Sequence, residues 1–304
     1  MTRKVALATA TLAVIFAPAL AARASVAQRN VAAAATFDSG ILKVERFGER
    51  GARPIVFIPA LFCGSWQWNA QINALSKSYD VFVVTLPGFD GRPMISGDAL
   101  MDRAARSIHG LIVARRLNRP AVVGHSLGGT LAVYFAERYP HDAGNVITVE
   151  GGYPEAPTQA GREAAVAKET APYRGIPQNK LGPLLREQML QYTITQTSDV
   201  ATVERYASLS QPQAIVDWMR AAFLLDLTPN LSKIAAPLTV IVPFDPRIDP
   251  YVGYATAEKK RAAYVRWAAH APNSSVILVQ PARHFVMFDQ PEEFERALEA
   301  ALER

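Results

Sequence analysis

Short apolar runs rich in valine and isoleucine alternate with helical patterns along most of this chain. Each run is continuous, and the segment after it carries apolar residues at helical spacing. Parallel strands covered by helices on both faces have this pattern, because both faces of such a sheet are buried. The sequence therefore predicts an α/β fold with a mostly parallel sheet. The predicted strands span residues 41–47, 54–59, 79–86, 120–124, 145–149, 237–242 and 275–279.

The alternation is interrupted once, after the strand that ends at residue 149. From Gly151 to about residue 231 the chain is helical, polar and punctuated by prolines, with no strand-like run of comparable strength. We therefore predict a core made of residues 36–150 and 232–304, with residues 151–231 as a helical insertion. The helices predicted within the core span residues 66–75, 98–117, 127–139, 255–269 and 291–302.

The first residues have the pattern of a secretory signal. Two basic residues precede an apolar, alanine-rich run over residues 5–20, and small residues then recur at the spacing that signal peptidase accepts. The run is short for a membrane-spanning helix, which needs about 20 apolar residues. We therefore expect residues 1–27 to be a cleaved signal, with cleavage after Ala21, Ala24 or Ala27. The mature protein is then periplasmic or secreted, without stable insertion in the membrane.

Charge and cysteine content exclude several classes of function. The formal net charge is +5 at pH 7, but three of the basic residues lie within the predicted signal, and no run of five like charges occurs. Nucleic-acid binding therefore has no support in the sequence. The single cysteine cannot form an internal disulfide, and it excludes a cysteine zinc cluster and a CxxC redox pair.

The strongest chemical signal is the segment Gly124-His125-Ser126-Leu127-Gly128, which joins a predicted strand to a predicted helix. In this arrangement the serine occupies a strained turn, and glycines flank it because side chains would collide there. The helix that follows directs the positive end of its dipole at the serine. Ser126 is therefore the predicted nucleophile, and the backbone N–H of Leu127 is a predicted oxyanion donor.

A serine nucleophile needs a base, and the base needs an orienting acid. His284 lies in a loop directly after the last predicted strand, at the carboxyl edge of the sheet where α/β proteins bind ligands. It alone of the five histidines fits the chain order serine, acid, histidine of this architecture. We predict His284 as the base, and His125 as a packing or supporting residue.

Three carboxylates compete for the role of the acid. Asp245 follows the strand at 237–242 most closely and is the preferred candidate. Asp249, four residues further on, is the alternative, and Glu150 after the strand at 145–149 is the third. Each aspartate also stands before a proline, where turn formation is a frequent structural role.

The loop after the strand at 54–59 should supply the second oxyanion donor, and the backbone N–H of Leu61 is the best candidate. The chain resembles α/β-hydrolase fold serine hydrolases in three features. These are the serine turn at 124–128, Trp68 after this loop, and the ending that runs from His284-Phe285 to the Asp-Gln-Pro-Glu-Glu-Phe segment at 289–294. The resemblance covers residues 41–150 and 232–304. The family usually has His-Gly where this chain has Pro-Ala before Leu61.

The resemblance implies that the insertion is a cap that roofs the active site. Apolar and aromatic side chains of the insertion are candidates for an apolar acyl pocket or for the core of the cap: Tyr153, Tyr173, Met189, Tyr192, Trp218, Met219, Phe223 and Leu224. The function expected is that of an exported serine hydrolase that cleaves a carboxylic ester of a small molecule through an acyl-enzyme, using a Ser-His-Asp triad and neither metal nor organic cofactor. Lactonase, thioesterase, carbon–carbon hydrolase and cofactor-free perhydrolase chemistry use the same machinery, and a ligand-binding protein with little turnover is the alternative from another class.

Overall fold

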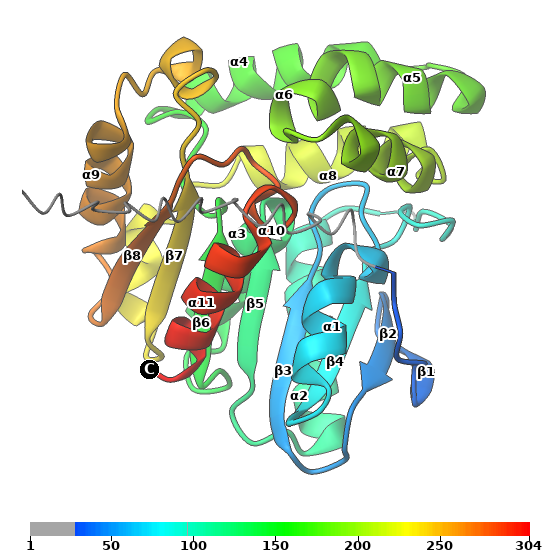
Figure 1. The fold of residues 1–304 in the computed structure, drawn as a ribbon, viewed down its shortest axis with the longest axis vertical. Helices are drawn as coiled ribbons and strands as arrows, with labels where there is room; N and C mark the ends of the chain where they lie inside the picture. Colours follow the sequence, from blue (N-terminus) through cyan, green and yellow to red (C-terminus); the bar gives the residue numbers. More distant parts are fainter. Residues whose placement is uncertain (1–27, 96) are drawn as a thin grey trace, which may run out of the picture.

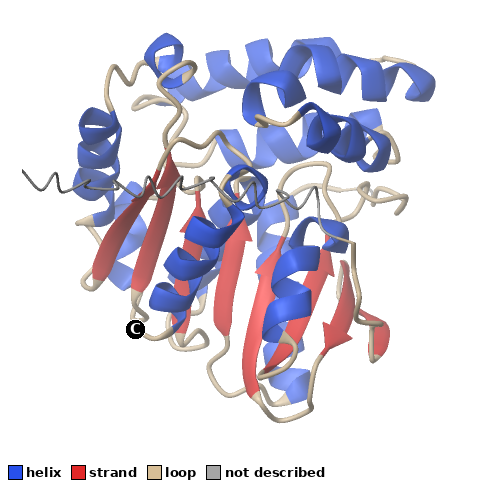
Figure 2. Ribbon diagram, in the orientation of Figure 1, coloured by secondary structure: helices blue, strands red, loops and turns tan. Residues whose placement is uncertain are grey.

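The computed structural model describes residues 28–95 and 97–304, so the predicted signal lies outside the described residues. Eight strands form one sheet in the order β1-β2-β4-β3-β5-β6-β7-β8 (Figures 1 and 2). β2 pairs antiparallel with both β1 and β4, and all other neighbours are parallel. This confirms the predicted mostly parallel sheet. The strands are β1 (Ala35–Ser39), β2 (Leu42–Phe47), β3 (Arg53–Ile58), β4 (Tyr79–Thr85), β5 (Ala121–His125), β6 (Asn145–Val149), β7 (Leu238–Pro243) and β8 (Ser274–Val279).

Helices cover both faces of the sheet, as expected for parallel strands. α1 and α11 lie on one face, and α2 and α3 lie on the other (Figure 1). α9 packs against β7 and β8 at the edge of the sheet. The helices of the core are α1 (Asn69–Leu75), α2 (Leu100–Arg115), α3 (Leu127–Arg138), α9 (Ala257–Ala268), α10 (Val286–Asp289) and α11 (Pro291–Leu302).

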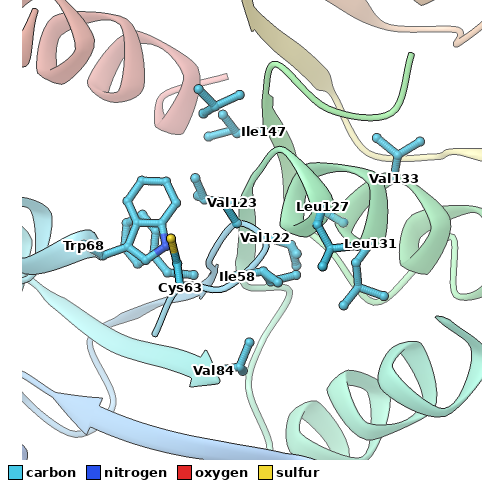
Figure 3. Packing of buried hydrophobic residues seen from close by; sticks show 14 of the residues in the cluster. Ile58, Cys63, Trp68, Val84, Val122, Val123, Leu127, Leu131, Val133 and Ile147 are labelled. Carbon is cyan, nitrogen blue, oxygen red and sulfur yellow. The ribbon is translucent and has the colours of Figure 1, made fainter. Parts of the chain in front are cut away.

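The core is the apolar layer between the sheet and these helices. β5 lies at its centre, and Val122 and Val123 are fully buried because successive side chains of a strand point to opposite faces, each covered by helices. Figure 3 shows both valines among Ile58 of β3, Leu131 of α3 and Ile147 of β6. Complete burial of such side chains stabilises the fold by roughly 1.5–3 kcal/mol each, and it fixes the strand ends from which the loops of the site emerge.

The helical insertion follows β6 and ends before β7. Its helices lie over the carboxyl edge of the sheet, at the top of Figure 1, and we call this insertion the cap. α8 attaches the cap to the core through contacts with α2 and α3, and the buried indole N–H of Trp218 donates to the carbonyl of Pro87 at 3.0 Å. The helices of the cap are α4 (Gln159–Thr170), α5 (Leu181–Leu185), α6 (Gln191–Thr193), α7 (Thr197–Ala207) and α8 (Pro212–Phe223). Across the described residues, no helix combines the length and hydropathy needed to cross a bilayer.

A buried carboxyl group on α3 makes the stability of the fold depend on pH. Glu137 is 8% exposed, and its Oε1 atom has no hydrogen-bonding partner among the described residues. Burial raises the pKa of Glu137 from 4.5 to about 8, and the nearby Lys233 and Arg138 oppose this only in part. The carboxyl is therefore protonated in the folded protein at a pH where it is ionised in the unfolded chain. The contribution of Glu137 to the free energy of unfolding therefore falls as pH rises from about 4.5 to about 8.

Glu137→Gln should remove this dependence, because glutamine keeps the shape and carries no titrating proton. The melting temperature of the variant relative to the parent protein is expected to rise by several degrees between about pH 5 and about pH 8.5. Thermal unfolding at the two pH values measures this, with Glu299→Gln on the exposed side of α11 as the matched control. If the difference in melting temperature between the variant and the parent protein were the same at both pH values, Glu137 would not be buried in its uncharged form.

Candidate active site

A cavity of about 620 Å³ lies between the carboxyl edge of the sheet and the cap. Loops that follow β3, β5, β6, β7 and β8 contribute to its lining, so that Ser126, Glu150 and His284 all face one space. Of the predicted pocket residues in the cap, five line the cavity: Tyr153, Met189, Tyr192, Met219 and Phe223. The other three, Tyr173, Trp218 and Leu224, do not. Tyr173 and Trp218 are buried in the packing of the cap instead.

Ser126 occupies the strained turn that its sequence context predicts. Its backbone has φ 54° and ψ −117°, and its N–H donates to the carbonyl of Val149 at 2.9 Å. The neighbouring glycines are required by space: a Cβ on Gly124 would lie 2.0 Å from the carbonyl oxygen of Gly128, and one on Gly128 would lie 2.2 Å from that of Ile58. The turn places Ser126 directly before α3, whose positive end faces the cavity.

Two backbone N–H groups beside Ser126 are free to bind an anion. Among the described residues, no acceptor pairs with the N–H of Leu61 or of Leu127, and both residues line the cavity. The N–H of Ala60 is already used, because it donates to Oε1 of Gln67 at 2.9 Å. The loop changes direction at Phe62, which has φ 53° and also lines the cavity. The structure therefore places both predicted donors at the site, and it distinguishes Leu61 from its neighbour Ala60.

The imidazole of His284 meets a carboxylate, and that carboxylate belongs to Glu150. His284 Nδ1 lies 2.7 Å from Glu150 Oε2. Glu150 is the first residue after β6, its φ is 44°, and its N–H donates to the carbonyl of Ile241 at 2.9 Å. No hydrogen bond joins the Ser126 hydroxyl to the imidazole among the described residues; such bonds often tighten only when substrate binds.

The prediction that Asp245 contacts His284 is wrong, and so is the alternative with Asp249. Asp245 accepts hydrogen bonds from Arg247 and from Arg283 Nε, the latter at 2.9 Å. Asp249 accepts from the N–H of Asp245 at 2.7 Å, and its other oxygen lies 2.7 Å from Lys260 Nζ. Local turn bonds and nearby cations therefore hold both aspartates away from the imidazole.

Both Glu150 and Asp245 are strongly ionised. Burial raises the pKa of Glu150, but the charges and hydrogen bonds of Lys260 and His284 outweigh burial and bring it to about 2. Burial also raises the pKa of Asp245, and the hydrogen bonds from Arg247 and Arg283 bring it to about 2. A low pKa therefore does not by itself identify the acid of the site. The 2.7 Å contact with His284 is what distinguishes Glu150 from Asp245.

A chain of buried hydrogen bonds connects the loop of Leu61 to the loop of His284. Gln67 accepts from Ala60 through Oε1, so its Nε2 donates to Nδ1 of His125 at 3.0 Å. Nε2 of His125 then donates to the carbonyl of His284 at 2.9 Å. This chain needs a neutral His125, and burial does hold the pKa of His125 well below its usual value. His125 thus has the supporting role that was predicted, whereas Gln67 stands in no motif that could have indicated its role.

The loop that carries His284 is bound to the cap on one side. Arg283 donates to the carbonyls of Gln191 and Ile194 at 2.8 and 2.9 Å. The N–H of Phe285 donates to the carbonyl of Thr193 at 3.0 Å. Asp289 accepts from both the N–H and the hydroxyl of Thr195, at 2.8 and 2.7 Å. The segment from α6 to the start of α7 and the loop of His284 therefore form one hydrogen-bonded unit.

Cys63 lies near the site but takes no part in it. It is fully buried, and Figure 3 shows it within the apolar cluster that contains Ile58 and Trp68. Burial raises the pKa of the Cys63 thiol well above its usual value, and the charge of Asp90 acts in the same direction. The thiol is therefore protonated and shielded from reagents.

Comparisons with known proteins agree with this geometry. The model of the alpha/beta hydrolase family matches residues 55–297. A "1-acylglycerol-3-phosphate O-acyltransferase ABHD5" of Rattus norvegicus is 24% identical over 270 residues, which cover 79% of this chain and 74% of the relative. An "(E)-2-((N-methylformamido)methylene)succinate hydrolase" of Acinetobacter baylyi is 25% identical over 267 residues, which cover 84% and 93%.

Solved structures show the same fold. A thermophilic esterase from Thermogutta terrifontis superposes with a TM-score of 0.69 at 20% identity, over 89% of this chain and 98% of the other. The family model matches most of the sequence. The strand order, with a serine turn after β5 and a histidine loop after β8, agrees with this match. The chain belongs to the α/β hydrolase family.

Proposed function

We propose that this protein is a serine hydrolase that cleaves carboxylic esters through an acyl-enzyme, with Ser126 as nucleophile, His284 as base and Glu150 as the acid. The observation that carries the proposal is the 2.7 Å contact between His284 Nδ1 and Glu150 Oε2 in the cavity that also holds the strained Ser126. A histidine oriented by a carboxylate, in the same cavity as a serine on a strained turn, is the arrangement that acyl transfer requires.

In the acylation step, the Ser126 hydroxyl attacks the ester carbonyl while Nε2 of His284 takes its proton. Glu150 stabilises the imidazolium and keeps Nδ1 protonated, so that Nε2 is the basic nitrogen. The tetrahedral oxyanion binds the N–H groups of Leu61 and Leu127. The imidazolium then returns the proton to the leaving alcohol, and a water molecule repeats the sequence to release the acid and free Ser126.

A burst experiment tests this chemistry. With a p-nitrophenyl ester, the purified protein should release about one equivalent of p-nitrophenol per Ser126 before steady turnover, provided that deacylation is slower than acylation. Stopping the reaction with acid and measuring the mass of the peptide that holds Ser126 should reveal the trapped acyl group. Binding of the ester without any release of p-nitrophenol would favour the ligand-binding alternative.

The charges of the cavity predict which esters are preferred. Its lining contains four carboxylates and two cations, and both cations are engaged: Lys260 by Glu150 and Asp249, and Arg283 by Asp245. An anionic substrate therefore finds no free cation among the described residues of the lining. Glu155 and Glu169 remain on the cap side of the cavity.

Ethyl levulinate and monoethyl succinate are nearly isosteric and differ in charge. We expect kcat/KM to be higher for the neutral ester by about tenfold or more, because a carboxylate near Glu155 and Glu169 is repelled. The difference should narrow at high salt and in Glu155→Gln. A preference for the succinate ester would contradict this and would bring the chain closer to the relative whose name includes a succinate.

We also propose that the protein is exported, on the basis of the signal pattern in residues 1–27. These residues lie outside the described part of the chain. The first described residues are bound to the core: Arg29 donates to Asn69, Glu45 and Ser65 at 2.9–3.1 Å. Cleavage after Ala27 would retain these contacts. Amino-terminal sequencing of protein from the periplasm or medium tests this, and a mature chain that still begins with Met1 would reject export by cleavage.

A further inference from the structure

One buried lysine lies behind the acid of the site and is not used by the proposed chemistry. Lys260 of α9 is 4% exposed, and its ammonium lies between two carboxylates. Nζ is 2.6 Å from Oε1 of Glu150 and 2.7 Å from Oδ1 of Asp249. A buried ammonium is costly unless it is paired in this way, so the three groups form one unit.

The geometry of this unit fixes both oxygens of Glu150. Oε2 contacts His284, and Oε1 contacts Lys260. Lys260 is itself held by Asp249, whose second oxygen accepts the N–H of Asp245 at 2.7 Å. A continuous path of hydrogen bonds therefore runs from the backbone after β7 to the imidazole. Without Lys260, Oε1 of Glu150 loses the only side-chain partner that the described residues give it.

The charges of the unit also matter for an imidazolium at His284. Lys260 alone would cancel the charge of Glu150, which is the charge that stabilises the imidazolium. Asp249 adds a second negative charge, so the unit keeps one net negative charge. We propose that Lys260 and Asp249 are positioning residues of the site: the Lys260 ammonium holds Glu150 against His284, and Asp249 restores the negative charge that Lys260 would otherwise cancel. This inference rests on the proposed function.

The other groups near His284 do not replace this unit. His125 is neutral, and Arg283 is held by Asp245 and by two carbonyls of the cap. The pKa of Glu155 is raised by burial, and Glu169 lies further out on the cap beside Lys168. The remaining titratable side chains that line this part of the cavity are Tyr153, Tyr254 and Tyr264. The tyrosines are uncharged at neutral pH, so Glu150, Lys260 and Asp249 form the charged unit that is in direct contact with the imidazole.

The test is the pH dependence of ester hydrolysis in Lys260→Met, Asp249→Asn and the double variant. The Lys260→Met variant should lose about tenfold or more in kcat with little change in KM, because Glu150 is no longer held in position. The acid limb of kcat/KM reports protonation of the base in the free enzyme. In Asp249→Asn its midpoint should move to lower pH by about half a unit or more, because Lys260 then cancels Glu150. In the double variant the midpoint should return close to that of the parent protein.

Lys259→Met is the matched control, because Lys259 is exposed on the same helix and its ammonium has no partner among the described residues. It should leave both kcat and the acid limb unchanged. An acid limb that stays in place in Asp249→Asn would overturn the inference even if Lys260→Met fails to fold. The two proposals fail separately: a parent protein without esterase activity rejects the proposed function, whereas an active protein with unmoved midpoints rejects only the charge-balancing pair.

Discussion

Replacement of Ser126 by alanine is expected to lower kcat/KM for p-nitrophenyl esters by about 10⁴-fold or more. The loss is large because the covalent path disappears, and only the oxyanion donors and the binding of substrate remain. Covalent labelling by a fluorophosphonate probe should vanish in the same variant. Rates and in-gel labelling of the purified proteins, with circular dichroism to establish folding, measure both effects.

The matched control is Ser78→Ala, at an exposed position before β4 and far from the cavity. It should retain labelling and activity. The proposed nucleophile would have to be abandoned if Ser126→Ala kept the probe, or if the folded parent protein never reacted with it. In the second case a ligand-binding role becomes the better account of the cavity.

Replacement of Glu150 by glutamine is expected to lower kcat by about 10³- to 10⁴-fold. Glutamine keeps the size of the side chain but cannot stabilise the imidazolium, and its amide leaves Lys260 with one carboxylate instead of two. Asp245→Asn is the informative comparison, since Asp245 is the acid preferred from the sequence. We expect Asp245→Asn to keep kcat within about tenfold of the parent value.

Asp245→Asn is expected to change the stability of the protein more than its activity. Asp245 binds Arg247 and Arg283, so its replacement weakens the loop after β7 and should lower the melting temperature. Parallel measurement of kcat and thermal unfolding therefore separates the acid of the site from a structural aspartate. A collapse of activity in Asp245→Asn with an active Glu150→Gln would reverse the assignment.

Most of the fold could be predicted because buried parallel strands leave a strong pattern. The ends of the seven predicted strands agree with the structure to within one residue. β1, with the sequence Ala-Thr-Phe-Asp-Ser, was missed because it is an antiparallel edge strand whose side chains are largely exposed. No continuous apolar run forms in such a strand, so periodicity carries little information there.

The site could be predicted where local sequence fixes local geometry. Ser126 lies on a turn that its own glycines permit, and His284 directly follows the last strand. The acid could not be chosen in this way, because three carboxylates follow neighbouring strands and chain order does not say which one reaches the imidazole. Packing decided it: Asp245 is held by arginines, and Lys260, far along the sequence, holds Glu150.

The bonds between the loop of His284 and the segment of the cap at Thr193 have a consequence for turnover. A displacement of the cap at this segment would also displace the loop that carries His284. Motions of the cap that keep these bonds leave the imidazole of His284 against Glu150. A cap motion compatible with the proposed chemistry is therefore one that keeps this segment fixed to the loop of His284.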